Sequence, residues 1–300
     1  MIIFLYCALF PIDLIQVKKI ISFYSFILFS TSCFCQQHFY TSFSAGLSNY
    51  KGDLGKTSLL QGKTDMVGGM GAVVELNNRM LIRGEFAYGK VSGTDKYDAK
   101  TISRNLSFTS KITEFALLFE YVLFDLYEYK FSPYFFTGIG TFKFSPYTKN
   151  KAGNIVFLAE LCTEGQGFYK DRKDYKLNCL AIPFGGGMQW ALSPNKRLAL
   201  EFGIRKTNTD YLDDVSTTYV DAALLAQKKG STAVSLAYRA GELPNAAPYP
   251  AGGSIRGNPK TKDWYFFSGL SFRISLQPNL KEHVYIYKPK TAKISCPTMF

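Results

Sequence analysis

The feature that most constrains the fold is an alternation of apolar and polar residues with a period of two, repeated along the chain. Such alternation is typical of β-strands whose two faces meet different surroundings. Within residues 80–89, for example, Met80 and Phe86 fall on one face, whereas Arg83 falls on the other. Eight segments show the pattern, namely residues 39–48, 66–76, 80–89, 111–124, 132–144, 177–191, 197–208 and 263–274.

The connections between these segments indicate whether the apolar face meets a protein core or lipid. A soluble, lipocalin-like barrel buries its apolar face, whereas a transmembrane barrel turns that face to lipid and its polar face to the lumen. The connections around residues 77–78, 125–130 and 193–195 are short, and the others are long. Alternating short and long connections place every long one at the same end. The sequence therefore predicts an all-β fold: an eight-stranded antiparallel transmembrane β-barrel of the outer membrane, with short periplasmic turns and long extracellular loops.

Composition bears on the same question. The mean hydropathy of −0.03 argues against a bundle of transmembrane helices, which would need repeated apolar runs of about 20 residues. The chain contains 26 Phe and 20 Tyr, and aromatic residues near strand ends are typical of the girdles at membrane interfaces. We expect such girdles to contain Tyr88, Tyr121, Tyr134, Trp190 and Trp264.

The interior of an eight-stranded barrel is just wide enough to be filled by side chains, so we expect no pore. Charged residues on the polar faces should pair with one another inside it. Glu114 and Glu120 could alternatively be catalytic, but six residues along a strand span about 20 Å, which is too far for joint acid–base work. The predicted lumen charges are Arg83, Glu85, Glu114, Glu120, Glu201, Arg205 and Arg273.

The N-terminus predicts a secretory signal peptide. Lys18 and Lys19 precede a short apolar run, and small residues follow up to Cys35, after which we place the cleavage site. An N-terminal membrane helix is the alternative, because residues 1–15 are also apolar. The predicted organisation is a signal peptide over residues 1–35, a barrel over residues 36–276 and a basic tail over residues 277–300.

Several classes of chemistry lack the residues they need. Cleavage would leave Cys162, Cys179 and Cys296, of which an oxidising compartment allows two to pair, and the pairing stays open. With two histidines and no CxxC, neither a zinc site nor a Ser-His-Asp set can be built. The net charge of +12 is scattered, without a basic stripe or a nucleic-acid-binding motif. We expect no enzyme, no cofactor and no nucleic-acid partner.

Acidic residues in the last long connection are the remaining candidates for a metal site. Asp210, Asp213, Asp214 and Asp221 could offer oxygen ligands to calcium, although their spacing is not that of an EF-hand. A hydrolase working at the loops with calcium, through Asp213 and Asp214, is therefore one alternative. A barrel that binds a lipid or another ligand is a second, which the charged lumen residues speak against.

Five groups of loop residues resemble the motifs of a known family. They are residues 46–55 (GLSNYKGDLG), 104–108 (RNLSF), 163–167 (TEGQG), 210–221 (DYLDDVSTTYVD), and 256–260 (RGNPK) with 263–267 (DWYFF). In this order they resemble the PorG family, whose members are outer-membrane β-barrel components of the type IX secretion system of Bacteroidota. The resemblance covers about residues 39–274, and the block at 210–221 is long enough to be specific.

The resemblance implies a non-catalytic role without a cofactor. A PorG-like protein associates with the periplasmic PorK–PorN ring, lies in outer-membrane lipid, and serves the export of cargo with C-terminal secretion signals. The resemblance carries over only the motif positions, as loop-packing or contact residues. These are Asn49, Tyr50, Gly52, Asp53, Arg104, Asn105, Glu164, Gln166, Asp210, Tyr211, Asp213, Asp214, Arg256 and Asn258.

Two features depart from the family pattern. The first 17 residues differ from an ordinary signal start, and the chain continues past the last strand through Lys281, Lys288, Lys290 and Lys293. The motif loops are also expected outside the cell, whereas the ring is periplasmic. We therefore expect the short turns and the tail after Gln277 to contact the ring.

Overall fold

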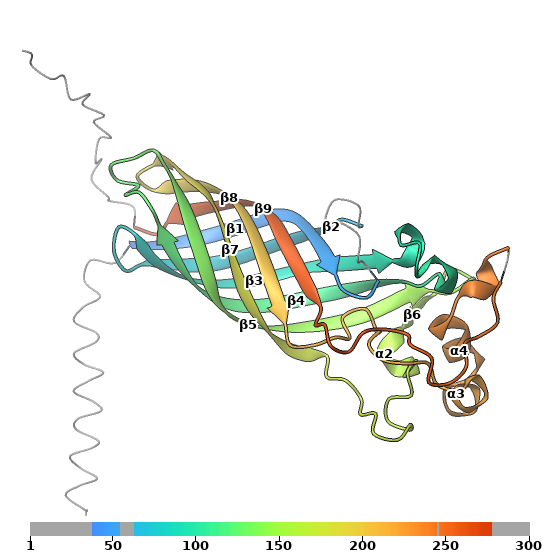
Figure 1. The fold of residues 1–300 in the computed structure, drawn as a ribbon. Coiled ribbons are helices and arrows are strands. Elements are labelled where there is room, and N and C mark those ends of the chain that lie inside the picture. Colours follow the sequence, from blue (N-terminus) through green and yellow to red (C-terminus); the bar gives the residue numbers. More distant parts are fainter. Residues whose placement is uncertain (1–37, 55–62, 245, 278–300) are drawn as a thin grey trace, which may run out of the picture. The chain divides into compact units, whose positions relative to one another are not determined.

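The computed structural model describes residues 38–54, 63–244 and 246–277. The predicted signal peptide and residues 278–300 of the predicted tail lie outside this part. Nine strands form one antiparallel sheet in the described residues, and eight of them close into a barrel through the pairing of β4 with β5 (Figure 1). The barrel strands are β1 (His38–Lys51), β2 (Asp65–Glu75), β3 (Met80–Thr94), β4 (Ser107–Val122), β5 (Phe131–Lys149), β7 (Asn178–Ser193), β8 (Lys196–Thr207) and β9 (Trp264–Ser275).

Each barrel strand pairs with its neighbours in the chain, and β9 returns to pair with β1. The short strand β6 (Ile155–Phe157) adds to the end of β5 without taking part in closure. All eight alternating segments of the sequence are strands of this barrel. The predicted all-β, eight-stranded antiparallel barrel is therefore confirmed.

The alternation separates two surfaces on each strand. On β3, the Arg83 side chain is inside and 1% exposed, whereas Phe86 is outside and 42% exposed. Large apolar residues face outward on every barrel strand, as Phe43, Met70, Phe86, Phe115, Phe135, Leu180, Leu200 and Leu270 do. The barrel is thus apolar outside, whereas its interior combines buried charges with apolar side chains such as Val73, Leu81 and Phe136. An apolar outer surface is the reverse of a soluble fold.

One aromatic residue was placed on the wrong surface by the sequence. Tyr134 is fully buried inside the barrel, where its hydroxyl donates to Glu201 Oε2 at 2.7 Å. It belongs to the lumen and not to a girdle, because its position on β5 has the parity of the inward residues Ser132 and Phe136. Tyr88 and Tyr121 do face outward.

The short and long connections lie at opposite ends of the barrel (Figure 1). At the short-turn end, Asn77 Oδ1 accepts hydrogen bonds from the backbone N–H groups of Arg79 and Met80, both at 2.9 Å. Asn78 donates to Asp125 Oδ2 at 2.6 Å and so joins two adjacent turns. Tight turns of this kind fix the register of the strands that they connect.

The long connections carry the helices of the described residues. These helices are η1 (Asp95–Tyr97), η2 (Ile102–Arg104), α2 (Leu158–Leu161), α3 (Ala222–Lys229), α4 (Ser231–Ala237) and η3 (Ala240–Glu242). None of the helices in the described part of the chain has the length and apolar character needed to cross a membrane. We call this assembly of long connections, residues 52–54, 95–106, 150–177 and 208–263 as far as they are described, the cap.

Candidate functional site

Two buried polar clusters are the candidates for function, one in the lumen and one in the cap. In the lumen, Arg83 is the centre of the network. Its Nε lies 2.8 Å from Glu120 Oε1, and its Nη1 lies 2.8 Å from Glu201 Oε2. Glu85 Oε2 is 3.4 Å from the same guanidinium. One arginine thus neutralises carboxylates from β4 and β8, across the interior of the barrel.

The other charged residues of the lumen form pairs around this centre. Arg273 binds both oxygens of Glu120, at 2.8 and 3.0 Å. Arg205 lies 3.4 Å from Glu114, which also accepts a hydrogen bond from the Tyr265 hydroxyl at 2.5 Å. All seven residues that the sequence assigned to the lumen therefore lie inside it and take part in these contacts.

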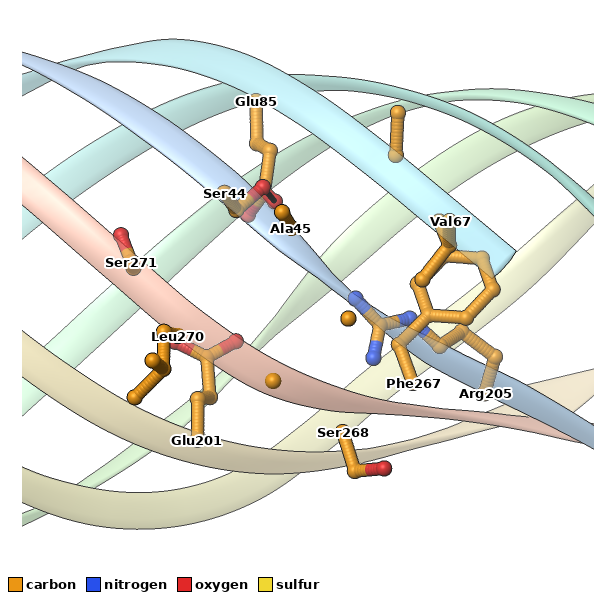
Figure 2. A pocket seen from close by; sticks show the side chains of 13 residues that line it. Ser44, Ala45, Val67, Glu85, Glu201, Arg205, Phe267, Ser268, Leu270 and Ser271 are labelled. Atoms are coloured by element: carbon orange, nitrogen blue, oxygen red, sulfur yellow. Dashed lines mark hydrogen bonds between the residues drawn. The ribbon is translucent and has the colours of Figure 1, made fainter. Parts of the chain in front are cut away.

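The space left in the lumen is small. A cavity of about 30 Å³ lies among Glu85, Glu201 and Arg205 and is lined on one side by Phe267 and Ser271 (Figure 2). This volume is enough for a water molecule, not for a lipid or a sugar. Arg205 Nη1, Glu85 Oε2 and Ser271 Oγ make no hydrogen bond to protein there, so ordered water is their expected partner.

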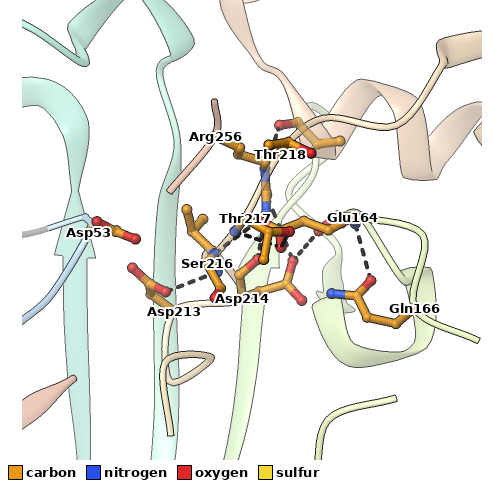
Figure 3. Close-up of polar contacts among 12 residues, drawn as sticks. Asp53, Glu164, Gln166, Asp213, Asp214, Ser216, Thr217, Thr218 and Arg256 are labelled. Atoms are coloured by element: carbon orange, nitrogen blue, oxygen red, sulfur yellow. Dashed lines mark hydrogen bonds and ion pairs between the residues drawn. The ribbon is translucent and has the colours of Figure 1, made fainter. Parts of the chain in front are cut away.

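In the cap, the central pair is Glu164 and Arg256, whose Oε1 and Nη1 are 3.0 Å apart (Figure 3). Both side chains are almost fully buried. The Glu164 carboxylate also accepts hydrogen bonds from the backbone N–H groups of Ser216 and Thr217, at 2.9 and 3.0 Å. Gln166 Oε1 accepts from the Glu164 N–H at 3.1 Å. Three motif segments, around residues 164, 216 and 256, are joined at this point.

A second cap pair joins Arg104 to Asp95. The guanidinium binds both carboxylate oxygens, at 2.7 and 2.8 Å. Arg104 also donates to the backbone carbonyls of Asp53 and Arg256, while Asp53 Oδ2 accepts from the Asn258 N–H at 2.7 Å. Gly257 has to be small, because a Cβ there would lie 2.5 Å from Asp53 Oδ2. The first, second and last motif segments therefore interlock.

A third group of contacts in the cap centres on the Tyr50 hydroxyl, which lies 2.7 Å from Asp213 Oδ2 and 2.8 Å from Asp263 Oδ1. A hydroxyl has one proton to donate, so the two carboxyl groups share a single donor. Burial raises the pKa of both Asp213 and Asp263 well above the usual range. The charge of Asp53 adds to the rise in the pKa of Asp213, and the charge of Asp213 adds to the rise in the pKa of Asp263. Gly52 permits the arrangement, since a Cβ would overlap Tyr50 Oη and Asp263 Oδ1.

The acidic block of the last connection does not converge on a metal site. Asp210 accepts from Ser216 Oγ, Asp214 from Thr163 and Tyr175, and Asp221 caps α3. Burial raises the pKa of Asp210 to about 7 and that of Asp214 to about 6. Among the described residues, no three His, Cys, Asp or Glu side chains are grouped as metal ligands. The calcium hypothesis thus finds no geometry to support it.

The remaining motif residues serve the same packing. Asn105 adopts a left-handed conformation at the end of η2 and donates to the Arg239 carbonyl at 3.3 Å. Tyr211 stacks on Tyr175 with ring centroids 4.6 Å apart, and Asn49 donates to Thr64 at 3.0 Å. None of the motif residues proposed as packing or contact positions is exposed. They hold the loops together and present little surface to a partner.

Sequence reasoning missed residues in both clusters. In the lumen, Arg197 pairs with Glu75 at 2.8 Å. Arg197 lies on the same face of β8 as Glu201 and Arg205, so the alternation of the sequence could have identified it. In the cap, Asp95 lies in no motif, and nothing local marks it as the partner of Arg104. Cys162 and Cys179 are both free thiols, so the local disulfide left open by the sequence is not present.

The chain belongs to the family DUF6089, described as a domain of unknown function, whose model matches residues 18–226. No curated protein matches it significantly. The solved structures that it resembles include neisserial surface protein A (10% identity, 79% of this chain and 96% of that chain, TM-score 0.39). Another is the attachment invasion locus protein Ail of Yersinia pestis (14% identity, 80% of this chain and 99% of that chain, TM-score 0.37). A third is a major outer membrane protein from Thermus thermophilus (13% identity, 80% of this chain and 99% of that chain, TM-score 0.38).

Proposed function

We propose that this DUF6089 member is a non-catalytic outer-membrane component of the type IX protein secretion system. In this role it associates with a periplasmic ring of PorK- and PorN-like proteins and is needed for the export of cargo with C-terminal secretion signals. The observation that carries the proposal is the cap. The five loop motifs that resemble the PorG family come from distant parts of the sequence, yet their described residues meet in one buried, interlocked structure.

Residence in the outer membrane is supported by the barrel surface. The outward positions of all eight strands carry exposed large apolar side chains, whereas soluble monomers rarely expose extended apolar patches. Outer-membrane barrels have their longer loops outside the cell and their short turns in the periplasm. The cap then lies outside the cell and the short-turn end faces the periplasm.

A non-catalytic role is supported by the way the buried acidic groups of the described residues are used. The buried carboxylates of the lumen and of the cap motifs, such as Glu120, Glu164 and Asp213, are engaged by arginines, hydroxyls or backbone N–H groups. The cavity in the lumen is too small for a ligand larger than water. No specific observation favours the alternatives of a ligand-binding or hydrolytic barrel.

The ring contact belongs at the periplasmic end. The turns there present exposed aromatic and apolar residues, among them Phe124, Tyr129 and Leu192, and the chain leaves the barrel at the same end after Ser275. Buried cap residues cannot supply this contact. We therefore assign it to the short turns together with the segment that follows Gln277.

A deletion strain and a pull-down test the proposal. Loss of the gene should abolish export of cargo with C-terminal signals while the other outer-membrane proteins stay in place. A tagged full-length copy, gently solubilised from the native outer membrane, should bring the two ring proteins with it. The substitution Tyr129→Asp should weaken this recovery, whereas Tyr97→Asp in the cap should not. Normal secretion in the deletion strain would contradict the proposal, as would a barrel recovered alone while the ring stays intact.

A further inference from the structure

Three lysines form a cluster on the outer surface of the barrel near its long-loop end. Lys90 on β3 lies directly opposite Lys111 on β4. On the next strand, β5, Lys143 pairs with Thr113, two residues from Lys111 and on the same face. All three side chains are exposed. We call Lys90, Lys111 and Lys143 the lysine triad.

On β3, β4 and β5, the lysine triad lies near the level at which the outward residues change from apolar to polar. On β3, Phe86 lies on the barrel side of Lys90, and Ser92 lies on its loop side. On β4 and β5 the first outward residue on the barrel side of Lys111 and Lys143 is a threonine, and the first apolar ones are Phe115 and Ile139. On the loop side of the two lysines the next outward residues carry hydroxyl groups. The three amines therefore stand at the edge of the apolar belt, at the level where lipid headgroups begin.

No carboxylate among residues 38–54, 63–244 and 246–277 pairs with these three amines. The outward positions of β3, β4 and β5 contain neither Asp nor Glu. Within the part of the chain that the structure describes, the three lysine side chains make no ion pair and no hydrogen bond. Like charges directly opposite each other on paired strands destabilise a sheet. An anion from outside the chain would remove this repulsion.

The spacing indicates what kind of anion fits. Neighbouring strands are about 4.8 Å apart, so three adjacent strands place the amines over about 10 Å. A headgroup with a single phosphodiester carries one charge and cannot engage all three amines, whereas a headgroup with several phosphates can. Lysine is well suited to this task, since it binds phosphate as a flexible point charge.

We propose that the lysine triad binds the phosphate groups of a multiply phosphorylated glycolipid in the outer leaflet of the outer membrane. The proposal rests on the outer-membrane residence of the proposed function, and not on the role in secretion. The bound headgroup neutralises Lys90 and Lys111 and fixes β3–β5, the strands that extend furthest into the cap.

Binding to the purified full-length chain in detergent micelles tests the proposal. The probe is lipopolysaccharide whose lipid A carries two phosphates, titrated and counted by native mass spectrometry. The triple variant Lys90→Gln/Lys111→Gln/Lys143→Gln should bind about 100-fold more weakly, since each lysine near an anionic membrane surface contributes about fivefold. The matched control Lys96→Gln/Lys100→Gln/Lys228→Gln removes the same charge from the cap and should bind as the unaltered chain does. Heat-modifiable mobility in gels verifies that both variants fold.

Two further ligands distinguish the sources of phosphate. The same glycolipid after enzymatic removal of its phosphates should bind as weakly as the triple variant does. Phosphatidylglycerol should bind weakly, and equal affinity for it would overturn the proposal in favour of an ordinary phospholipid. Equal binding of lipopolysaccharide by the triple variant would also overturn it. Fractionation of native membranes tests the proposed function separately. A barrel found outside the outer membrane contradicts that function, whatever result the titration in micelles gives.

Discussion

The lumen and the cap both bury several ion pairs, but they use their carboxylates differently. In the lumen the charged groups bind other side chains, as Glu120 binds Arg83 and Arg273. In the cap they also bind backbone: Glu164 accepts from two N–H groups, and Asp213 accepts from the N–H groups of Leu54 and Val215. The difference follows from the neighbouring secondary structure. Strands satisfy each other's backbone, whereas buried loops have donors and acceptors that need side-chain partners.

The lumen and the cap should also differ in how far the loss of one buried partner destabilises the protein. The lumen network is enclosed by a closed sheet, so a group that loses its partner there cannot reach bulk water without opening the barrel. The cap consists of loops at the rim, which can open locally while the barrel stays closed. We therefore expect lumen substitutions to affect the whole barrel and cap substitutions to affect the cap alone.

The largest effect is expected for Arg83→Met. The substitution leaves Glu120, Glu201 and Glu85 in the lumen without their shared cation, and loss of one partner of a buried ion pair costs about 3–5 kcal/mol. The free energy of unfolding of the barrel, measured from urea titrations by heat-modifiable mobility, should fall by this amount. Arg79→Met, at an exposed arginine of the first short turn, is the control and should change little. A wild-type midpoint for Arg83→Met would mean that the lumen charges are solvated.

Arg256→Met should open the cap and spare the barrel. It removes the cation from Glu164 and Asp214 and the donor to the Asp214 carbonyl. If the cap loses about 3 kcal/mol, its open fraction and the rate of proteolysis within residues 150–177 rise by about two orders of magnitude. Lys260→Met, at an exposed lysine of the same connection, is the matched control. A parallel fall in the urea midpoint of the barrel would show that the two regions unfold together.

The two regions also differ in what the sequence could predict. The lumen follows from a local rule: once the period of two is found, every second residue points inward, and Arg83 and Glu201 both enter the narrow interior. Glu75 was not predicted because the inward positions of β2 that precede it, from Val67 to Val73, are glycine and valine and give the strand no polar face. In the cap, Arg256 and Glu164 are 92 positions apart. The motifs marked which residues matter, but their pairing depends on loop paths that have no periodicity.

The pH dependence of the cap follows from Asp214 and Asp210, whose pKa values burial raises to about 6 and about 7. In the unfolded chain an Asp ionises near pH 3.9. Between about pH 4 and pH 7 the folded cap therefore binds more protons than the unfolded one, so its stability rises as the pH falls through this window and is lost as the pH rises.

The urea midpoint at which the buried Cys162 thiol becomes accessible to a labelling reagent measures this effect. The midpoint should be higher at pH 5 than at pH 8. A variant with Asp210→Asn should lose the part of the change that lies near pH 7, and Asp98→Asn, in the loop after β3, serves as the control. A midpoint that falls on acidification would contradict the assigned protonation of the buried carboxyl groups.

The smallest effect is expected for Tyr50→Phe, which probes the junction of the two regions. Tyr50 belongs to β1, yet its hydroxyl serves Asp213 and Asp263 of the cap. The variant keeps the ring contact with Phe108, and both carboxyl groups keep backbone donors. The lost hydrogen bonds should cost the cap about 1 kcal/mol.

For Tyr50→Phe, the urea concentration at which the Cys162 thiol becomes accessible should therefore fall slightly. The urea midpoint for unfolding of the barrel should stay unchanged. Tyr129→Phe, at an exposed tyrosine of the short-turn end, provides the control. If the barrel midpoint falls together with that of the cap, the proton shared at Tyr50 couples the two regions. The cap would then unfold as part of the same cooperative unit as the barrel. The expectation that lumen and cap substitutions act on separate regions would be wrong.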